Sequence, residues 1–135
     1  MPGLLDGAAT LGAALERLQA EVESLFGVTV ETVVVGDCEL EDNLISLLEA
    51  TREAMVNAAR WSGATEVSVF AEVDAEIVVI YVRDRGKGFD ESAVAANHRG
   101  LAESIRGRMT RHGGRAALRS RLGEGTEVTL RMPRP

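Results

Sequence analysis

Two apolar segments that only two residues separate constrain the fold of this chain most strongly. They are EVSVFAEV and EIVVIYVRD, at residues 66–73 and 76–84, and both are rich in the β-branched and aromatic residues that favour strands. Asp74 and Ala75 between them give the spacing of a β-hairpin, so the strands should be antiparallel neighbours. Because the second segment is apolar on both faces, we place it in the centre of a sheet.

Three more strands and three helices are predicted along the rest of the chain. Residues 28–35, VTVETVVV, are β-branched and end at a glycine, while RAALRSRL and TEVTLRM flank the turn Gly123-Glu124-Gly125 as a second hairpin. Apolar residues at helical spacing predict helices over residues 11–26, 40–60 and 100–112, and residues 85–99 are expected to form a loop. The expected fold is therefore α+β, a two-layer α/β sandwich. Its sheet should be mixed but mostly antiparallel, with about five strands, and about three helices should cover one face.

Size, charge and cysteine content exclude several classes of protein. With 135 residues, 45% of them hydrophobic, the chain is large enough for one compact domain. A net charge of −6 argues against general nucleic-acid binding, which needs a basic surface. The single Cys38 cannot form an intrachain disulfide, and we interpret it as a structural thiol. No basic start leads into an apolar run, and no stretch reaches 18 apolar residues, so we expect a cytoplasmic protein.

Three polar residues share one face of the helix predicted over residues 40–60. Glu53, Asn57 and Arg60 are three or four positions apart, opposite a stripe of leucines, so their side chains should be neighbours on the helix surface. An amide oxygen beside a carboxylate can hold Mg²⁺, directly or through water, and an arginine one turn on can meet phosphate oxygens. The alternative is an ordinary solvated helix face, which most charged stripes are.

A second candidate site is YVRDRGKGFD at residues 81–90, where a buried strand ends on an aspartate. The carboxylate of Asp84 should lie at the rim of the core, where it needs hydrogen-bond donors that a ligand could supply. Gly86 and Gly88 allow either a close approach of the backbone to a flat group or a positive φ. The alternative is a plain turn in which Asp84 caps local amides. The segment does not match the dinucleotide-binding fingerprint, because the third glycine is missing.

The start of the third predicted helix offers an anion site. If this helix begins after His98-Arg99-Gly100, its free backbone amides and positive dipole end face the glycine-containing loop. A carboxylate, a magnesium-binding patch and an anion site would then converge on one polyanion. His98 and His112 are too few and too scattered for a metal site, and we interpret them as loop and helix-end residues.

These residues together resemble the ATP-binding catalytic domain of bacterial sensor histidine kinases, within the group that also includes gyrase, the heat-shock chaperone of ninety kilodaltons and the mismatch-repair ATPases. The resemblance covers about residues 28–133. Four motifs carry it, in family order: Glu53-x-x-x-Asn57-x-x-Arg60 resembles the asparagine box, Asp84-x-Gly86-x-Gly88-Phe89 the first glycine box, Arg99-Gly100-Leu101 the second, and Gly123-x-Gly125-Thr126 the last.

The resemblance implies a role for each matched residue. Asp84 would accept a hydrogen bond from the exocyclic amine of adenine, and Thr126 would support that carboxylate, directly or through water. Gly86 and Gly88 would let the base and the lid hinge sit close. Asn57 would bind Mg²⁺, Glu53 would orient water or poise the accepting imidazole, and Arg60 would touch the phosphates. Residues 91–99 would form the ATP lid, with His98 and Gly100 near the phosphate chain. Leu101 would complete the cofactor-binding set.

The chain departs from the family pattern in two ways. Trp61 follows Arg60 where the family usually has histidine or tyrosine, so the aromatic character is kept but a hydrogen bond from imidazole is not. No helix resembling the acceptor-histidine box precedes the ATP-binding region, so we expect an excised module or one that acts on a separate partner. Residues 1–27 would then be an amphipathic leader helix, the remnant of a linker to a missing dimerisation domain, and residues 28–135 the ATP-binding kinase domain.

Three functions fit these residues. In the first, the chain binds Mg-ATP and donates the γ-phosphate to a histidine on a helical dimerisation domain of its parent kinase, with a response regulator as an indirect partner. The alternative is a free-standing anti-sigma-factor serine kinase, which sequesters a sigma factor and phosphorylates its antagonist. The third is a nucleotide-binding domain that only signals occupancy, and the presence of both Glu53 and Asn57 argues against it. No membrane contact by the chain itself is expected.

Overall fold

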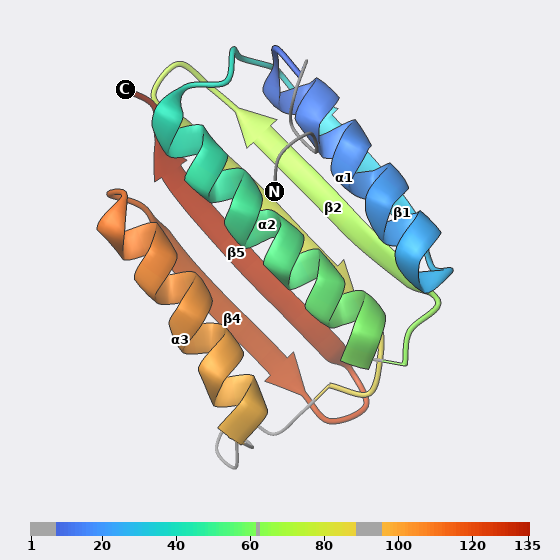
Figure 1. Cartoon of the computed structure of the whole chain (residues 1–135). Helices are drawn as coiled ribbons and strands as arrows, with labels where there is room; N and C mark the ends of the chain where they lie inside the picture. Colours follow the sequence, from blue (N-terminus) through green and yellow to red (C-terminus); the bar gives the residue numbers. More distant parts are fainter. Residues whose placement is uncertain (1–7, 62, 89–95) are drawn as a thin grey trace.

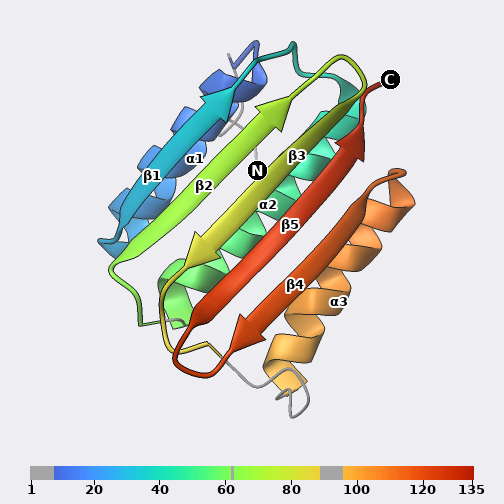
Figure 2. The ribbon, with the colours of Figure 1, turned by 180° about the vertical axis from the view of Figure 1, so that it is seen from behind.

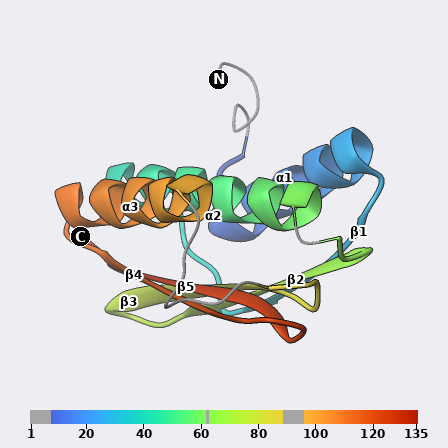
Figure 3. The same ribbon diagram turned by 90° about the horizontal axis from the view of Figure 1, so that it is seen from below.

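The chain folds into two layers, a sheet and a set of helices on one of its faces (Figure 1). The computed structural model describes residues 8–61, 63–88 and 96–135. Seen edge-on, all three helices lie above the sheet (Figure 3). The predicted two-layer α+β sandwich with a mixed sheet is confirmed. No helix in these described ranges has the length and apolar character needed to cross a membrane.

The strands form one sheet in the order β1-β2-β3-β5-β4. β1 and β2 are parallel, whereas all other neighbours are antiparallel. The predicted hairpins are both present, and β3 is central, as its apolar character on both faces indicated. The strands are β1 Thr29–Val35, β2 Glu66–Val73, β3 Ile77–Asp84, β4 Arg115–Arg121 and β5 Gly125–Pro133.

The helices are α1 Leu11–Phe26, α2 Asp42–Trp61 and α3 Ala96–Arg111. α1 has clear boundaries: the Thr10 hydroxyl accepts a hydrogen bond from the Ala13 amide at 3.2 Å, and Gly27 ends the helix with a φ of 68°. α3 begins at Ala96, four positions before the predicted start at Gly100. Ala96 is a good helix former, and the cost of a glycine inside a helix, about 1 kcal/mol, is small enough for neighbouring packing to offset.

The core lies between the sheet and the helices. Along β3, Val78, Ile80 and Val82 point toward the helices and are almost fully buried, because successive strand residues face opposite sides of a sheet. β5 contributes Val128, Leu130 and Met132 from the same side. The helices contribute mostly aliphatic side chains, among them Leu11, Leu15, Leu18, Leu44, Leu47, Leu48, Ile105 and Met109.

α1 is part of this core. It packs against β1 and α2, and its residues Leu11, Leu15 and Leu18 are at most 1% exposed. On the surface between the two helices, Glu21 of α1 forms an ion pair with Arg52 of α2. The first helix is therefore joined to the sheet layer by both apolar contact and charge.

Candidate functional site

Asp84 is a buried carboxylate at the end of the central strand. Its exposed fraction is 4%, and it lies on the helix-covered side of the sheet with Val82 and Ile80. Its Oδ1 accepts a hydrogen bond from the backbone amide of Gly86 at 2.8 Å. Burial raises the pKa of Asp84, while the backbone amides of Gly86 and Thr126 oppose that rise because they favour the ionised form. The carboxylate is thus partly desolvated and supported by the backbone around it.

Thr126 is directly opposite Asp84 in the ladder between β3 and β5. Its hydroxyl lies 2.8 Å from the hydroxyl of Ser120, and Ser120 donates to the carbonyl of Gly125 at 3.1 Å. A hydroxyl has one proton, so when Ser120 gives its proton to the carbonyl, Thr126 donates to Ser120. The lone pairs of the Thr126 oxygen are then left to accept from other groups near Asp84.

The sequence did not single out Ser120, although it is only 7% exposed. One signal was available. In RAALRSRL the serine alternates with Ala116 and Leu118 on the covered face of the strand. A hydroxyl in such a position needs a hydrogen-bond partner, which is a reason to suspect a role in the site.

The loop after β3 packs tightly on the turn between β4 and β5. Gly88 has a φ of 60°, and a Cβ there would lie 2.0 Å from the carbonyl oxygen of Arg121. Gly125 has a φ of 86°, and a Cβ there would lie 2.1 Å from the carbonyl oxygen of Asp84. The amide of Gly123 donates to the carbonyl of Lys87 at 2.7 Å. Of the two alternatives considered for Gly88, the positive φ is present, and the backbone there lies close to the neighbouring turn.

Two of the three polar residues on this face of α2, Glu53 and Asn57, are less exposed than residues of a solvated helix face. The Glu53 side chain is 27% exposed and lies 3.7 Å from a guanidinium nitrogen of Arg108 on α3. Asn57 is half-buried, whereas Arg60, in the last turn, is exposed. The ion pair between helices could not be foreseen from periodicity, because it depends on how α2 and α3 pack.

α2 runs along the sheet toward the Asp84 end. In its first turn, the side-chain amide of Asn43 donates to the carbonyl of Pro133, which is opposite Ile77 at the start of β3. Asn57 is 14 residues after Asn43, about 21 Å along an α-helix. Asp84 is seven residues after Ile77, about 23 Å along a strand. Asn57 and Asp84 therefore lie toward the same end of the molecule, where α2 and β3 both finish (Figure 1).

The second glycine motif lies within α3. His98, Gly100 and Leu101 are all part of the helix, which corrects the expectation that free amides would follow Gly100. The free amides of a helix belong to its first turn, which here starts at Ala96. Of the predicted lid, residues 96–99 are helical and residues 91–95 lie outside the described residues. α3 nevertheless begins at the end of the molecule where β3 and α2 finish (Figure 1).

Solved structures share this fold. The ATP-binding domain of PrrB from Mycobacterium tuberculosis superposes with a TM-score of 0.72 at 25% identity, over 90% of this chain and 91% of that one. The mycobacterial sensor histidine kinase MprB gives a TM-score of 0.70 at 19% identity, over 92% of this chain and 94% of that one. Both coverages are high, so the likeness involves whole domains.

The sequence identifies the family. Residues 42–135 match the family described as histidine kinase-, DNA gyrase B-, and HSP90-like ATPase, and the chain belongs to it. The resemblance drawn from the four motifs is thus confirmed. Among curated relatives, the nitrate/nitrite sensor protein NarX of Escherichia coli K12 is 34% identical over 89% of this chain and 20% of its own length. The sensor histidine kinase LiaS of Bacillus subtilis is 33% identical over 70% of this chain and 25% of its own length. The chain therefore spans only a fifth to a quarter of these relatives.

Proposed function

We propose that the chain is the ATP-binding catalytic module of a sensor histidine kinase and that adenine binds at Asp84. The observation that carries the adenine site is the buried carboxylate of Asp84 at the end of β3. An ionised carboxylate has about four acceptor positions, and two backbone amides leave room for the exocyclic amine of a purine. Gly86 keeps the backbone beside it free of a side chain, and Thr126 supports the carboxylate from β5.

The phosphates and Mg²⁺ belong at the α2 side of the same end. Asn57 is half-buried and carries an amide oxygen, a ligand type that Mg²⁺ accepts together with phosphate oxygens and water. Such a site needs only one or two protein ligands, so the residues present fit the ion. Glu53 would orient a water or the accepting imidazole, with Arg108 holding its carboxylate in place. Arg60 would contact the phosphates with its guanidinium.

The start of α3 is the proposed second phosphate contact. A helix N-terminus favours anions through its free amides and dipole. His98 lies in the first turn of α3, and Gly100 and Leu101 follow it in the helix. We place these three residues in the cofactor-binding set because α3 begins beside the end of β3. The bound nucleotide would then bridge the sheet, α2 and α3.

In the parent protein the γ-phosphate would pass to a histidine on a helical dimerisation domain, and from there to a response regulator. The support is the family match together with the sensor kinases among the relatives, of which this chain spans only a part. Residues 1–27 would lead from the dimerisation domain into the ATP-binding domain at residues 28–135, with α1 packed on the core of that domain. Because ATP is the substrate, we place the module in the cytoplasm. The serine-kinase alternative has no comparable support.

The transfer can be tested with the purified chain and γ-labelled ATP. We expect the chain to bind ATP without labelling itself, and to label the histidine of a dimerisation domain supplied separately. Phosphohistidine is acid-labile and base-stable, whereas phosphoserine behaves in the opposite way. Acid-stable, base-labile label on an added partner would select the serine-kinase alternative. Acid-labile label on the chain alone would show that it is not a module dependent on a separate acceptor.

A further inference from the structure

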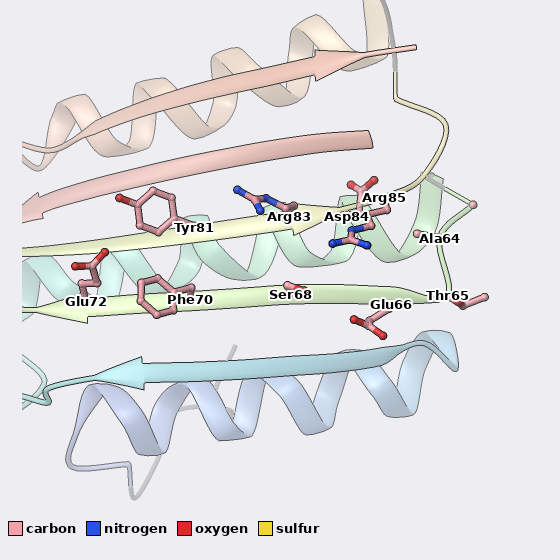
Figure 4. A pocket seen from close by; sticks show the side chains of 11 residues that line it. Ala64, Thr65, Glu66, Ser68, Phe70, Glu72, Tyr81, Arg83, Asp84 and Arg85 are labelled. Atoms are coloured by element: carbon pink, nitrogen blue, oxygen red, sulfur yellow. The ribbon is translucent and has the colours of Figure 1, made fainter. Parts of the chain in front are cut away.

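The sheet has a second face, opposite the helices, that no described part of the chain covers (Figure 2). Exposure follows the strand alternation, since residues between the core positions point away from the helices. A hollow of about 840 Å³ lies on this face, bordered by Glu66, Ser68 and Phe70 of β2 and by Tyr81 and Arg83 of β3 (Figure 4). The hollow also reaches Asp84 and Arg85 at the end of β3. The Asp84 side chain alternates with Arg83 and lies on the helix-covered side of the sheet, so the charged side chains of this face are distinct from the proposed nucleotide site.

The ladder register divides this face into rows that cross the strands. Three central rows run from β1 to β4 in the order β1, β2, β3, β5, β4. They are Glu31-Ser68-Arg83-Glu127-Arg119, Val33-Phe70-Tyr81-Thr129-Ala117, and Val35-Glu72-Val79-Arg131-Arg115. The middle row carries no charge and contains the rings of Phe70 and Tyr81, whose centroids are 6.0 Å apart. Charged rows thus flank an apolar, aromatic row.

The charges on this face, in the three central rows and beside them, are ordered by strand. On β1 and β2 they are acidic, at Glu31, Glu66 and Glu72. On β4 they are basic, at Arg115, Arg119 and Arg121, and Arg131 adds a fourth basic residue near the end of β5. In the middle, Arg83 and Glu127 form an ion pair within the chain. The face therefore has one acidic side and one basic side.

We propose that this face binds a second copy of the chain through a two-fold axis parallel to the strands. Such an axis places β1 over β4 of the partner subunit, β2 over β5 and β3 over β3. Because this rotation keeps each row over the same row, Glu31 meets Arg119 of the partner subunit and Glu72 meets Arg131 of the partner subunit. Tyr81 meets its own copy at the centre, and each of these two charged contacts occurs twice. Arg83 also meets its own copy, and its ion pair with Glu127 of the same chain offsets that contact between like charges.

The charge pattern and the area of the face both favour a second copy of the chain as the partner. A two-fold axis perpendicular to the strands would instead place the acidic side over the acidic side of the second copy and the basic side over the basic side. An acidic partner protein would be attracted only to the basic side, at β4. Five strands at about 4.8 Å spacing and seven residues at about 3.3 Å give a face of about 550 Å² in projection, before side-chain relief is counted. Stable interfaces bury about 800 Å² of accessible surface per partner, which is the same order.

Two charge-reversed variants test the pairing. The double variant Glu31→Arg/Glu72→Arg reverses the acidic member of each proposed contact, and Arg119→Glu/Arg131→Glu reverses the basic member. We expect the unmodified chain to form a dimer in sedimentation equilibrium at micromolar to millimolar concentration, and each variant alone to dimerise at least tenfold more weakly. An equimolar mixture of the two variants should recover a one-to-one dimer.

A matched control changes the same number of charges on the helix layer. Glu16→Arg/Glu49→Arg alters exposed residues of α1 and α2, and it should leave the dimer unchanged. Circular dichroism of every variant establishes that the fold is intact. A monomeric unmodified chain at millimolar concentration would overturn the proposal, as would dimers that survive both reversals or a mixture that stays monomeric. Nucleotide affinity should be the same in all variants, so the outcome is independent of the proposed function.

Discussion

The substitution Asp84→Asn tests the adenine site most directly. It replaces one carboxylate oxygen by an amide nitrogen of nearly equal size and removes the charge. Asp84 is 4% exposed, so water cannot take over the lost hydrogen bond with the adenine amine. Disrupting a buried hydrogen bond to a charged group costs about 1–3 kcal/mol, which corresponds to a Kd about 5- to 150-fold weaker.

The same substitution has a second, pH-dependent effect on stability. Burial raises the pKa of Asp84 in the folded chain, so the folded state keeps this proton to a higher pH than the unfolded state does. The stability of the native chain should therefore fall as the pH rises from the unfolded pKa, about 3.9, through the raised folded pKa. The Asp84→Asn chain cannot ionise there, so its stability relative to the native chain should rise over that window and stay level above it.

Calorimetric titration with ATP and urea unfolding between pH 3 and pH 8 measure the two effects. Asp74→Asn is the matched control, since Asp74 lies in the β2–β3 turn at the far end of β3 and accepts backbone amides of Glu76 and Ile77 at 2.8 Å. Those bonds lower the pKa of Asp74, so its substitution should give the opposite pH trend and leave ATP affinity unchanged. Unchanged ATP affinity in a folded Asp84→Asn chain would refute the adenine role.

Three further substitutions probe the packing of the loop after β3 on the β4–β5 turn, the core and the proposed metal site. Gly88→Ala should destabilise the chain by more than about 2 kcal/mol in urea unfolding, because it adds a steric clash to the cost of a positive φ. Gly123→Ala, with open space around its Cβ, should cost only about 1–2 kcal/mol. Equal losses of stability would contradict the close packing of the loop after β3 on the β4–β5 turn. The chain should lose about 2–5 kcal/mol of unfolding free energy when Leu18, which is 1% exposed, is replaced by alanine, because a cavity is left in the core. Leu25→Ala, at a residue 61% exposed, should cost less than about 0.5 kcal/mol. Equal losses in the two variants would contradict a contribution of α1 to the core. Asn57→Ala should spare ATP binding in EDTA but abolish its enhancement by Mg²⁺ in calorimetry, and an equal enhancement in both proteins would count against the metal role.

The strands could be predicted from the sequence because their signals are local. The alternation in residues 66–84 and the two-residue turn determine both the pairing and the covered face. The start of α3 was predicted too late for a local reason as well. Gly100 resembles a helix boundary, and the first turn at Ala96 has no acidic residue to mark it.

The sequence could propose a residue for the candidate site only where that residue carries a signal of its own. Asp84 is marked by the apolar strand before it, and Asn57 by its position between Glu53 and the end of α2. The hydrogen bond between Ser120 and Thr126 depends on the register of β4 and β5, and the ion pair between Glu53 and Arg108 on helix packing. Such contacts join residues far apart in the chain, so no single window of sequence contains them.

The contact between the loop after β3 and the β4–β5 turn joins residues that are 33 to 41 positions apart in the chain, so it requires the last hairpin to be in place. The surroundings of the Asp84 carboxylate are therefore completed only when the last hairpin has docked. A shortened chain that stops before Gly123 would lack β5, and with it both Thr126 and the strand that joins β3 to β4, so it should not bind ATP.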